Sequence, residues 1–176
     1  MTQSNGSVTL ILGGARSGKS RYAETICRQT ERALIYVATA EAHDDEMEAR
    51  IAQHRADRAA DGWLTIEEPR DLAGVLNGET APGRVLLVDC LTLWLTNHLL
   101  GDAEIDAEIG RLCAAVSASS ADLVLVANEV GFGIVPENKL ARAFRDHAGR
   151  LNQRIAAIAD RVTLVVAGLP VQVKGS

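Results

Sequence analysis

VTLILGGARSGKS, residues 8–20, joins an apolar, β-branched run to a glycine-rich segment that ends in Gly-Lys-Ser. The segment from Gly13 to Ser20 satisfies the G-x-x-x-x-G-K-[ST] phosphate-binding pattern. Its context fits, because the apolar run predicts a strand before it and residues 20–29 are expected to form a helix after it. Glycines let the backbone wrap around phosphates, and the first helical turn adds free N–H groups and a partial positive charge.

This stretch therefore predicts a nucleotide-binding loop. In such a loop Lys19 contacts the β- and γ-phosphates, and the Ser20 hydroxyl ligates Mg²⁺. The alternative is a glycine-rich turn in which Lys-Ser occurs by chance, and the flanking strand and helix argue against it.

The composition indicates one α/β domain without nucleic-acid partners. The chain has 176 residues, of which 47% are hydrophobic and only 3% aromatic, so Ala, Val, Leu and Ile must build the core. Such residues suit a sheet covered on both faces by helices. The formal net charge of −5 argues against nucleic acid or an anionic membrane as the main partner. Three widely spaced cysteines without a C-x-x-C pattern indicate neither disulfides nor a zinc site.

The chain is expected to be a cytoplasmic protein. Residues 1–7 are polar and lack a basic start, so we expect a flexible N-terminus rather than a signal peptide, followed by a single catalytic domain over residues 8–176. No apolar run reaches the ~18 residues of a membrane span.

Strand and helix patterns alternate along the chain. Apolar runs predict strands at 8–12, 33–38, 64–66, 85–88, 122–127, 161–167 and 170–174. Helices are predicted at 20–29, 44–60, 69–76, 90–100, 102–119 and 137–159, the last with Pro136 at its first position. This order predicts a P-loop NTPase-like fold, with a mostly parallel sheet flanked by helices and an antiparallel C-terminal edge strand.

Two carboxylates follow predicted strands. Asp89 ends the apolar run V-L-L-V-D, where a P-loop protein places the acid that holds Mg²⁺. An acid at this position can instead cap a helix. Glu129 follows the strand at 122–127, and it could hold magnesium, position a nucleophile or cap a loop.

The segment N-E-V-G-F-G-I-V-P-E, residues 128–137, is unusually apolar for a loop. Two glycines flank Phe132, with Ile134 and Val135 nearby. A structural loop explains the glycines but not the apolar residues. An apolar lip for a large substrate, or a subunit contact, is the alternative.

The helix expected at 44–58 carries a histidine among cations. At 3.6 residues per turn Met47, Arg50, Ile51, His54 and Arg58 share one side. A lone histidine on a charged helix is usually only solvated. The cationic setting would nevertheless suit a phosphate held against an imidazole nucleophile.

Taken together, G-G-A-R-S-G-K-S, A-T-A, D-D-E-M-E-A-R-I-A-Q-H-R, L-L-V-D-C-L-T and N-E-V-G-F-G-I-V-P-E-N resemble the bifunctional adenosylcobinamide kinase / adenosylcobinamide-phosphate guanylyltransferase family of cobalamin biosynthesis. The resemblance covers nearly the whole chain after Ser7. It implies phosphoryl transfer from ATP or GTP to the aminopropanol hydroxyl of adenosylcobinamide. It also implies a second reaction, in which GMP passes from GTP through a GMP-histidine intermediate to adenosylcobinamide phosphate.

The resemblance also implies the site. His54 takes the place of the guanylylated histidine, although some relatives carry two adjacent histidines where this chain has Gln53-His54. Mg²⁺ is the implied metal and a homotrimer the implied assembly, with cobinamide near a subunit boundary. The implied nucleotide contacts are Gly13, Gly14, Ala15, Arg16, Ser17, Gly18, Lys19, Ser20, Ala38, Thr39, Ala40, Arg55, Ala56, Asp57, Arg58, Glu67 and Asp89.

Two other functions are compatible with the motifs. One is a single-function P-loop small-molecule kinase in which His54 has no chemical role. The other is a non-catalytic NTP-binding switch module, which is weakened by the absence of an N-K-x-D guanine-specificity motif from the chain.

Overall fold

The protein folds around one seven-stranded sheet. The structure, a computed structural model, describes residues 6–41, 45–101 and 103–175, except for the side chains at positions 46, 47 and 50. The strand order is β3-β2-β4-β5-β1-β6-β7. All neighbouring strands are parallel except β6 and β7, which pair antiparallel. The predicted P-loop NTPase-like architecture, with its antiparallel edge strand, is therefore confirmed. The strands are β1 Val8–Gly13, β2 Ala33–Ala38, β3 Leu64–Glu67, β4 Arg84–Asp89, β5 Asp122–Asn128, β6 Arg161–Val166 and β7 Leu169–Lys174.

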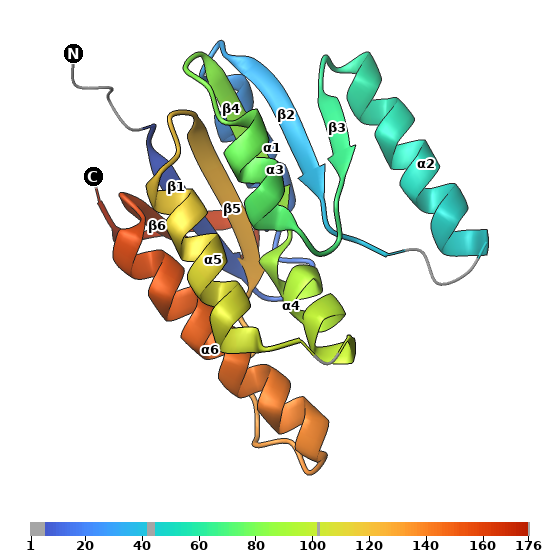
Figure 1. The fold of residues 1–176 in the computed structure, drawn as a ribbon, viewed down its shortest axis with the longest axis vertical. Helices are drawn as coiled ribbons and strands as arrows, with labels where there is room; N and C mark the ends of the chain where they lie inside the picture. Colours follow the sequence, from blue (N-terminus) through green and yellow to red (C-terminus); the bar gives the residue numbers. More distant parts are fainter. Residues whose placement is uncertain (1–5, 42–44, 102, 176) are drawn as a thin grey trace.

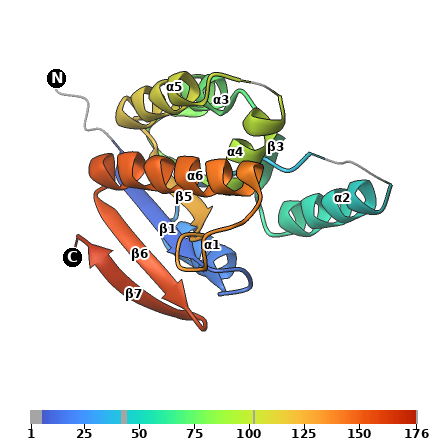
Figure 2. The same cartoon turned by 90° about the horizontal axis from the view of Figure 1, so that it is seen from below.

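Helices cover the two faces of the sheet unequally (Figures 1 and 2). α3, α4, α5 and α6 pack on one face, where Leu10, Leu86 and Leu125 belong to the larger core cluster. α1 packs on the other face through Ala23 and Cys27. α2 lies beyond β3 at the edge of the sheet, away from both layers. The helices are α1 Lys19–Arg28, α2 Asp45–Ala60, α3 Leu72–Glu79, α4 Leu91–Leu100, α5 Ile105–Ser117 and α6 Lys139–Ile158.

Three helices begin at least two residues later than the sequence predicts. α5 begins at Ile105 rather than at residue 102, and the other two, α3 and α6, each have a side-chain N-cap. The helix expected from Pro136 begins at Lys139, because the Asn138 side chain accepts a hydrogen bond from the Ala141 N–H at 3.1 Å and acts as its N-cap. α3 begins at Leu72 rather than at residue 69, because Asp71 caps it by accepting from the Gly74 N–H. A polar side chain that satisfies a free N–H group decided both boundaries.

The N-terminal segment is described from Gly6 onward. The Gly6 N–H donates to the Ser119 carbonyl at 3.0 Å, and the Ser7 N–H donates to Asp122 Oδ1 at 2.9 Å.

None of the described helices is long and apolar enough to cross a membrane.

Candidate functional site

The glycine loop connects β1 to α1 at the carboxyl edge of the sheet. Gly18, just before α1, has φ of 92°, a left-handed conformation that favours glycine. Gly13 is needed for a different reason. A Cβ at this position would lie 2.4 Å from Ser17 Oγ and 2.8 Å from the Val165 carbonyl oxygen. The loop therefore runs so close to its own turn and to β6 that a side chain at Gly13 does not fit.

Positive charge gathers where the loop enters α1. Arg16, Lys19 and Arg21 line a cavity of about 320 Å³ together with Gly18 and Ser20. The Lys19 Nζ donates to the Gly14 carbonyl at 3.2 Å, so the ammonium lies against the loop. A helix N-terminus surrounded by cations is an arrangement that binds phosphate groups.

A second cavity, of about 190 Å³, joins α2 to the ends of β2 and β4. Ile51, His54 and Arg58 line it from α2, as their spacing on one helix side predicts. Asp89 faces them from β4. An exposed imidazole thus shares a hollow with a carboxylate and a guanidinium. The remaining lining residues are Tyr36, Ala38, Ala40 and Leu93.

Asp89 is held by a residue that the sequence analysis did not single out. The Tyr36 hydroxyl donates to Asp89 Oδ2 at 2.9 Å. Burial raises the pKa of Tyr36, and the neighbouring Asp89 carboxylate raises it further, so Tyr36 remains a hydrogen-bond donor. A tyrosine inside the apolar run A-L-I-Y-V-A was the available signal, because a buried phenol needs a partner for its hydroxyl.

Thr39 has a structural role in this arrangement. It is completely buried, its hydroxyl donates to the Cys90 carbonyl at 2.7 Å, and the same hydroxyl accepts from the Cys90 N–H at 2.8 Å. These bonds join the segments that follow β2 and β4. Ala38 and Ala40, on either side of Thr39, line the cavity instead.

The other predicted α2 contacts lie outside the His54 cavity. Arg55 pairs with Glu67 at 3.4 Å, and both side chains are exposed. Asp57 accepts from Gln53 at 2.8 Å, and Ala56 is also exposed. His43, the other histidine near this helix, and the Arg50 side chain lie outside the described part of the chain.

A third cavity, of about 440 Å³, adjoins the glycine loop. Phe132 and Glu129 line it together with residues 14–17 of the loop and residues 164–167 at the end of β6. Glu129 Oε1 accepts from the Gly131 N–H at 2.6 Å, so of its three possible roles the structure displays the loop cap. Arg145 of α6, which was not predicted, donates to the Gly131 carbonyl at 2.6 Å and fixes the same loop.

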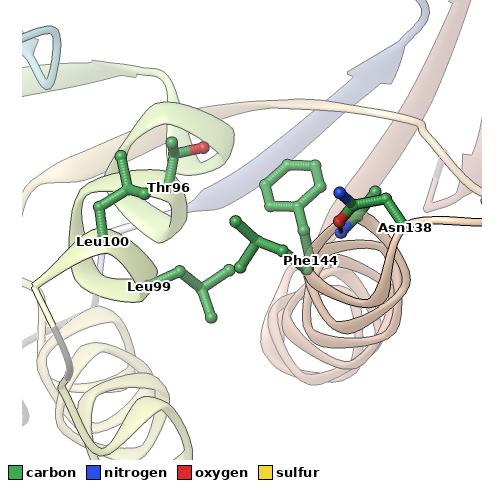
Figure 3. Close-up of a pocket in the computed structure, with 7 residues that line it drawn as sticks. Thr96, Leu99, Leu100, Asn138 and Phe144 are labelled. Carbon is green, nitrogen blue, oxygen red and sulfur yellow. Dashed lines mark hydrogen bonds between the residues drawn. The ribbon is translucent and has the colours of Figure 1, made fainter.

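An apolar groove of about 430 Å³ lies between α4 and α6. Figure 3 shows the Leu99 side chain extending from α4 toward α6, which carries Phe144. The residues of α6 that line the groove follow the apolar segment after β5 in the chain. In that segment the Phe132 side chain is 85% exposed and the Ile134 side chain 95% exposed. The lining residues are Thr96, Leu99, Leu100, Asn138, Leu140, Ala141 and Phe144.

The three cysteines line none of the cavities described above. All three are free thiols, and burial raises the pKa of each, that of Cys27 to about 12. Within residues 6–41, 45–101 and 103–175 there is no group of three His, Cys, Asp or Glu side chains placed to hold a metal ion.

Comparisons with known proteins agree on one family. Residues 9–173 match the model of the family described as cobinamide kinase / cobinamide phosphate guanyltransferase. The chain is 52% identical over 168 residues to the bifunctional adenosylcobalamin biosynthesis protein CobP of Pseudomonas aeruginosa, covering 94% of this chain and 96% of that protein. It is 46% identical over 180 residues to the bifunctional adenosylcobalamin biosynthesis protein CobU of Salmonella typhimurium. That alignment covers 94% of this chain and 98% of CobU.

Solved structures are similar at the level of the fold. The flagellar accessory protein FlaH from Methanocaldococcus jannaschii has a TM-score of 0.53 at 16% identity, covering 98% of this chain and 80% of that one. A type III secretion system ATPase of pathogenic bacteria has a TM-score of 0.56 at 13% identity, covering 96% and 57%.

Proposed function

Because the chain belongs to the cobinamide kinase / cobinamide phosphate guanyltransferase family, we propose that it carries out both reactions on adenosylcobinamide, through the cavities at the glycine loop and the cavity that contains His54. It phosphorylates adenosylcobinamide with ATP or GTP. It then transfers GMP from GTP to adenosylcobinamide phosphate through guanylylated His54, giving adenosylcobinamide-GDP. The observation that carries the proposal is the placement of His54 opposite Asp89 in one cavity at the carboxyl edge.

The kinase step uses the glycine loop. Lys19 and the free N–H groups of the α1 N-terminus hold the triphosphate, and they stabilise charge that develops on the transferred group. The substrate hydroxyl oxygen forms a bond to the γ-phosphorus, the bond from the γ-phosphorus to its bridging oxygen breaks, and the nucleoside diphosphate leaves. The hydroxyl proton is released. This step needs no imidazole.

The guanylyl step uses the α2 cavity. A neutral His54 nitrogen forms a bond to the α-phosphorus of GTP, and pyrophosphate leaves. A phosphate oxygen of adenosylcobinamide phosphate then forms a bond to the same phosphorus and releases the imidazole. Arg58, which lines the same cavity, offsets the charge of the attached GMP.

The residues present are suited to Mg²⁺. Ser20 is the second residue of α1, directly after Lys19, and Asp89 is half-buried at the end of β4. Tyr36 occupies only one Asp89 oxygen, and among the described side chains no partner is present for the other. Mg²⁺ is commonly held by one or two protein groups together with substrate phosphates. When bound there, it would neutralise phosphate charge, while Ser20 and Asp89 would orient it.

The cavity that contains Phe132 is suited to the corrinoid substrate. It adjoins residues 14–17 of the glycine loop, and Phe132 gives it an apolar rim. We assign the nearby exposed residues Ile134 and Val135 to a contact with a second copy of the chain, in the homotrimer that the family resemblance suggests. Exposed aliphatic side chains of this size are typical of interaction surfaces.

Labelling with GTP tests the proposal directly. Incubation with α-³²P-GTP should leave acid-labile, base-stable label on the protein, as a phosphoramidate would. His54→Asn should remove this label and the GDP product, while phosphorylated adenosylcobinamide accumulates. His54 is exposed, so the variant should fold normally. His43→Asn is the matched control. Loss of the label in the control, or its persistence in His54→Asn, would contradict the assignment.

A further inference from the structure

The helix that carries His54 is attached to the sheet almost without apolar packing. α2 lies beside β3, outside the two helical layers (Figure 1). Of its described side chains only Ile51 and Arg58 are half-buried, and the others are exposed. Burial of an apolar face is what normally fixes a helix in place. A different kind of contact must therefore set the position of His54.

Arg58 provides that contact. Its Cζ lies 3.9 Å from the centroid of the Tyr36 ring, a cation–π distance. Its Nε also donates to Thr65 Oγ1 at 3.4 Å, which adds a weaker bond to β3. His54 and Arg58 are four residues apart, so they lie on the same side of the helix, one turn from each other. The contacts that fix the position of Arg58 therefore also fix the position of His54 on the helix.

The Tyr36 ring is itself fixed on its other sides. Tyr36 is 7% exposed and belongs to the core cluster beneath α1. Trp63 packs edge-on against it, with 5.7 Å between the ring centroids and planes 85° apart. The hydroxyl bond to Asp89 closes the arrangement at 2.9 Å. One rigid side chain thus touches both the carboxylate on β4 and the cation on α2.

We propose that Tyr36 is a positioning residue with two separable actions: its hydroxyl orients the Asp89 carboxylate, and its ring face holds Arg58 and thereby places His54. The inference rests on the proposed function. The hydroxyl serves both reactions, because both need Asp89 and the anchored triphosphate. The ring face serves guanylyl transfer in particular, because only that reaction needs His54.

Two substitutions separate these actions. Tyr36→Phe keeps the ring and removes the hydroxyl, so kinase and guanylyl transfer should fall together. A hydrogen bond to a charged group corresponds to about a tenfold to hundredfold change in rate. The Mg²⁺ concentration for half-maximal activity should rise in both reactions. Arg58→Met keeps much of the side-chain length and removes the cation, so the rate of GMP-histidine formation should fall at least tenfold further than the kinase rate.

The two variants should also combine predictably. Arg58→Met should have its full effect in a Tyr36→Phe background, because the ring is still present. It should have a smaller additional effect in a Tyr36→Leu background, because the contact that places His54 is already gone and only the charge that Arg58 offers the attached GMP is still to be lost. If Tyr36→Leu does not fold, the comparison of Tyr36→Phe with Arg58→Met still decides the proposal. Tyr22→Phe on α1 and Arg111→Met on α5 are controls for loss of a hydroxyl and of an exposed arginine.

The outcomes are distinguishable. A purely structural Tyr36 would lower the thermal unfolding temperature without changing the Mg²⁺ dependence, and that result would overturn the first action. An Arg58→Met variant that loses both reactions equally would overturn the second. A wild-type protein that forms neither the GMP adduct nor phosphorylated adenosylcobinamide would refute the proposed function instead.

Discussion

Substituting alanine at Gly13 and Gly14 should have opposite effects on stability, although the two glycines are adjacent in the same loop. At Gly13 the added Cβ would lie 2.4 Å from Ser17 Oγ and 2.8 Å from the Val165 carbonyl oxygen, both closer than real Cβ contacts allow. At Gly14 nothing lies within 4 Å of the added atom. Only the first substitution forces the structure to move.

The loss of stability in Gly13→Ala depends on which of the two neighbouring atoms can move away from the added Cβ. Ser17 Oγ belongs to a side chain that can rotate. The Val165 carbonyl cannot shift freely, because Gly13 and Val165 are paired in the β1–β6 ladder. Overpacking of this kind costs about 1–3 kcal/mol. For a chain of this size that corresponds to roughly 2–12 °C in the unfolding temperature. Gly14→Ala should leave stability unchanged or raise it by up to about 1 kcal/mol, because it restricts the unfolded chain.

Urea and thermal unfolding of the two variants, each with and without Mg²⁺-GTP, measure this difference. Gly13→Ala should also gain less stability from the nucleotide, because the displaced loop binds phosphate less well. Gly13→Ala/Ser17→Ala should recover only part of the loss. If Gly13→Ala unfolds within about 0.5 kcal/mol of Gly14→Ala, or if the double variant recovers fully, the assignment of the cost to the Val165 carbonyl is refuted.

Three further predictions concern charge, pH and assembly. Lys19→Ala should lower both kinase and guanylyl-transfer rates by about 10²–10³, since both need the triphosphate held; turnover near the wild-type rate would exclude this phosphate site. Burial raises the pKa of Cys27 from 9.0 to about 12, so the unfolded chain loses this thiol proton at a lower pH than the folded chain. The contribution of Cys27 to the free energy of unfolding is therefore constant below pH 9 and declines from pH 9 to 12. Urea unfolding across that range should show a shallower decline for Cys27→Ala. Sedimentation of the wild type at micromolar concentration should give a trimer, and Ile134→Ser/Val135→Ser should shift it toward monomer; a fully active wild-type monomer would contradict the proposed interface.

The parts of the fold that depend on local pattern could be predicted from the sequence. Continuous apolar runs such as residues 85–88 and 122–127 belong to central parallel strands, which are buried on both faces and have no alternation to obscure them. The glycine loop could also be predicted, because the spacing of its glycines, Lys19 and Ser20 is itself the pattern that forms the loop. Helix starts were less certain, since Pro136 and Asn138 are both good helix-start residues and only the observed side-chain bond of Asn138 decides between them.

Contacts between distant segments could not be predicted. Nothing in the sequence indicates that Arg145 fixes a loop fourteen positions earlier, or that Tyr36 of β2 bonds to Asp89 of β4. Glu129 illustrates the limit well. The local sequence around Glu129 is compatible with all three of its possible roles. The 2.6 Å hydrogen bond from the Gly131 N–H to Glu129 Oε1, which reveals the loop cap, can be seen only in the folded structure.

The location of Tyr36 explains how one small domain could serve two transfers. Phosphoryl and guanylyl transfer attack different phosphorus atoms of a nucleotide, so each needs its own nucleophile beside a shared phosphate anchor. In the proposed mechanism the sheet supplies the anchor where β1 ends, and α2, which lies outside both layers, supplies the imidazole of His54. Because the described side chains of α2 bury no apolar face, the position of this helix depends on polar and cation–π contacts, among them the contact between Arg58 and Tyr36, one helical turn from His54. Because Arg58 reaches Tyr36 and Tyr36 reaches Asp89, the position of that helix remains linked to the phosphate site.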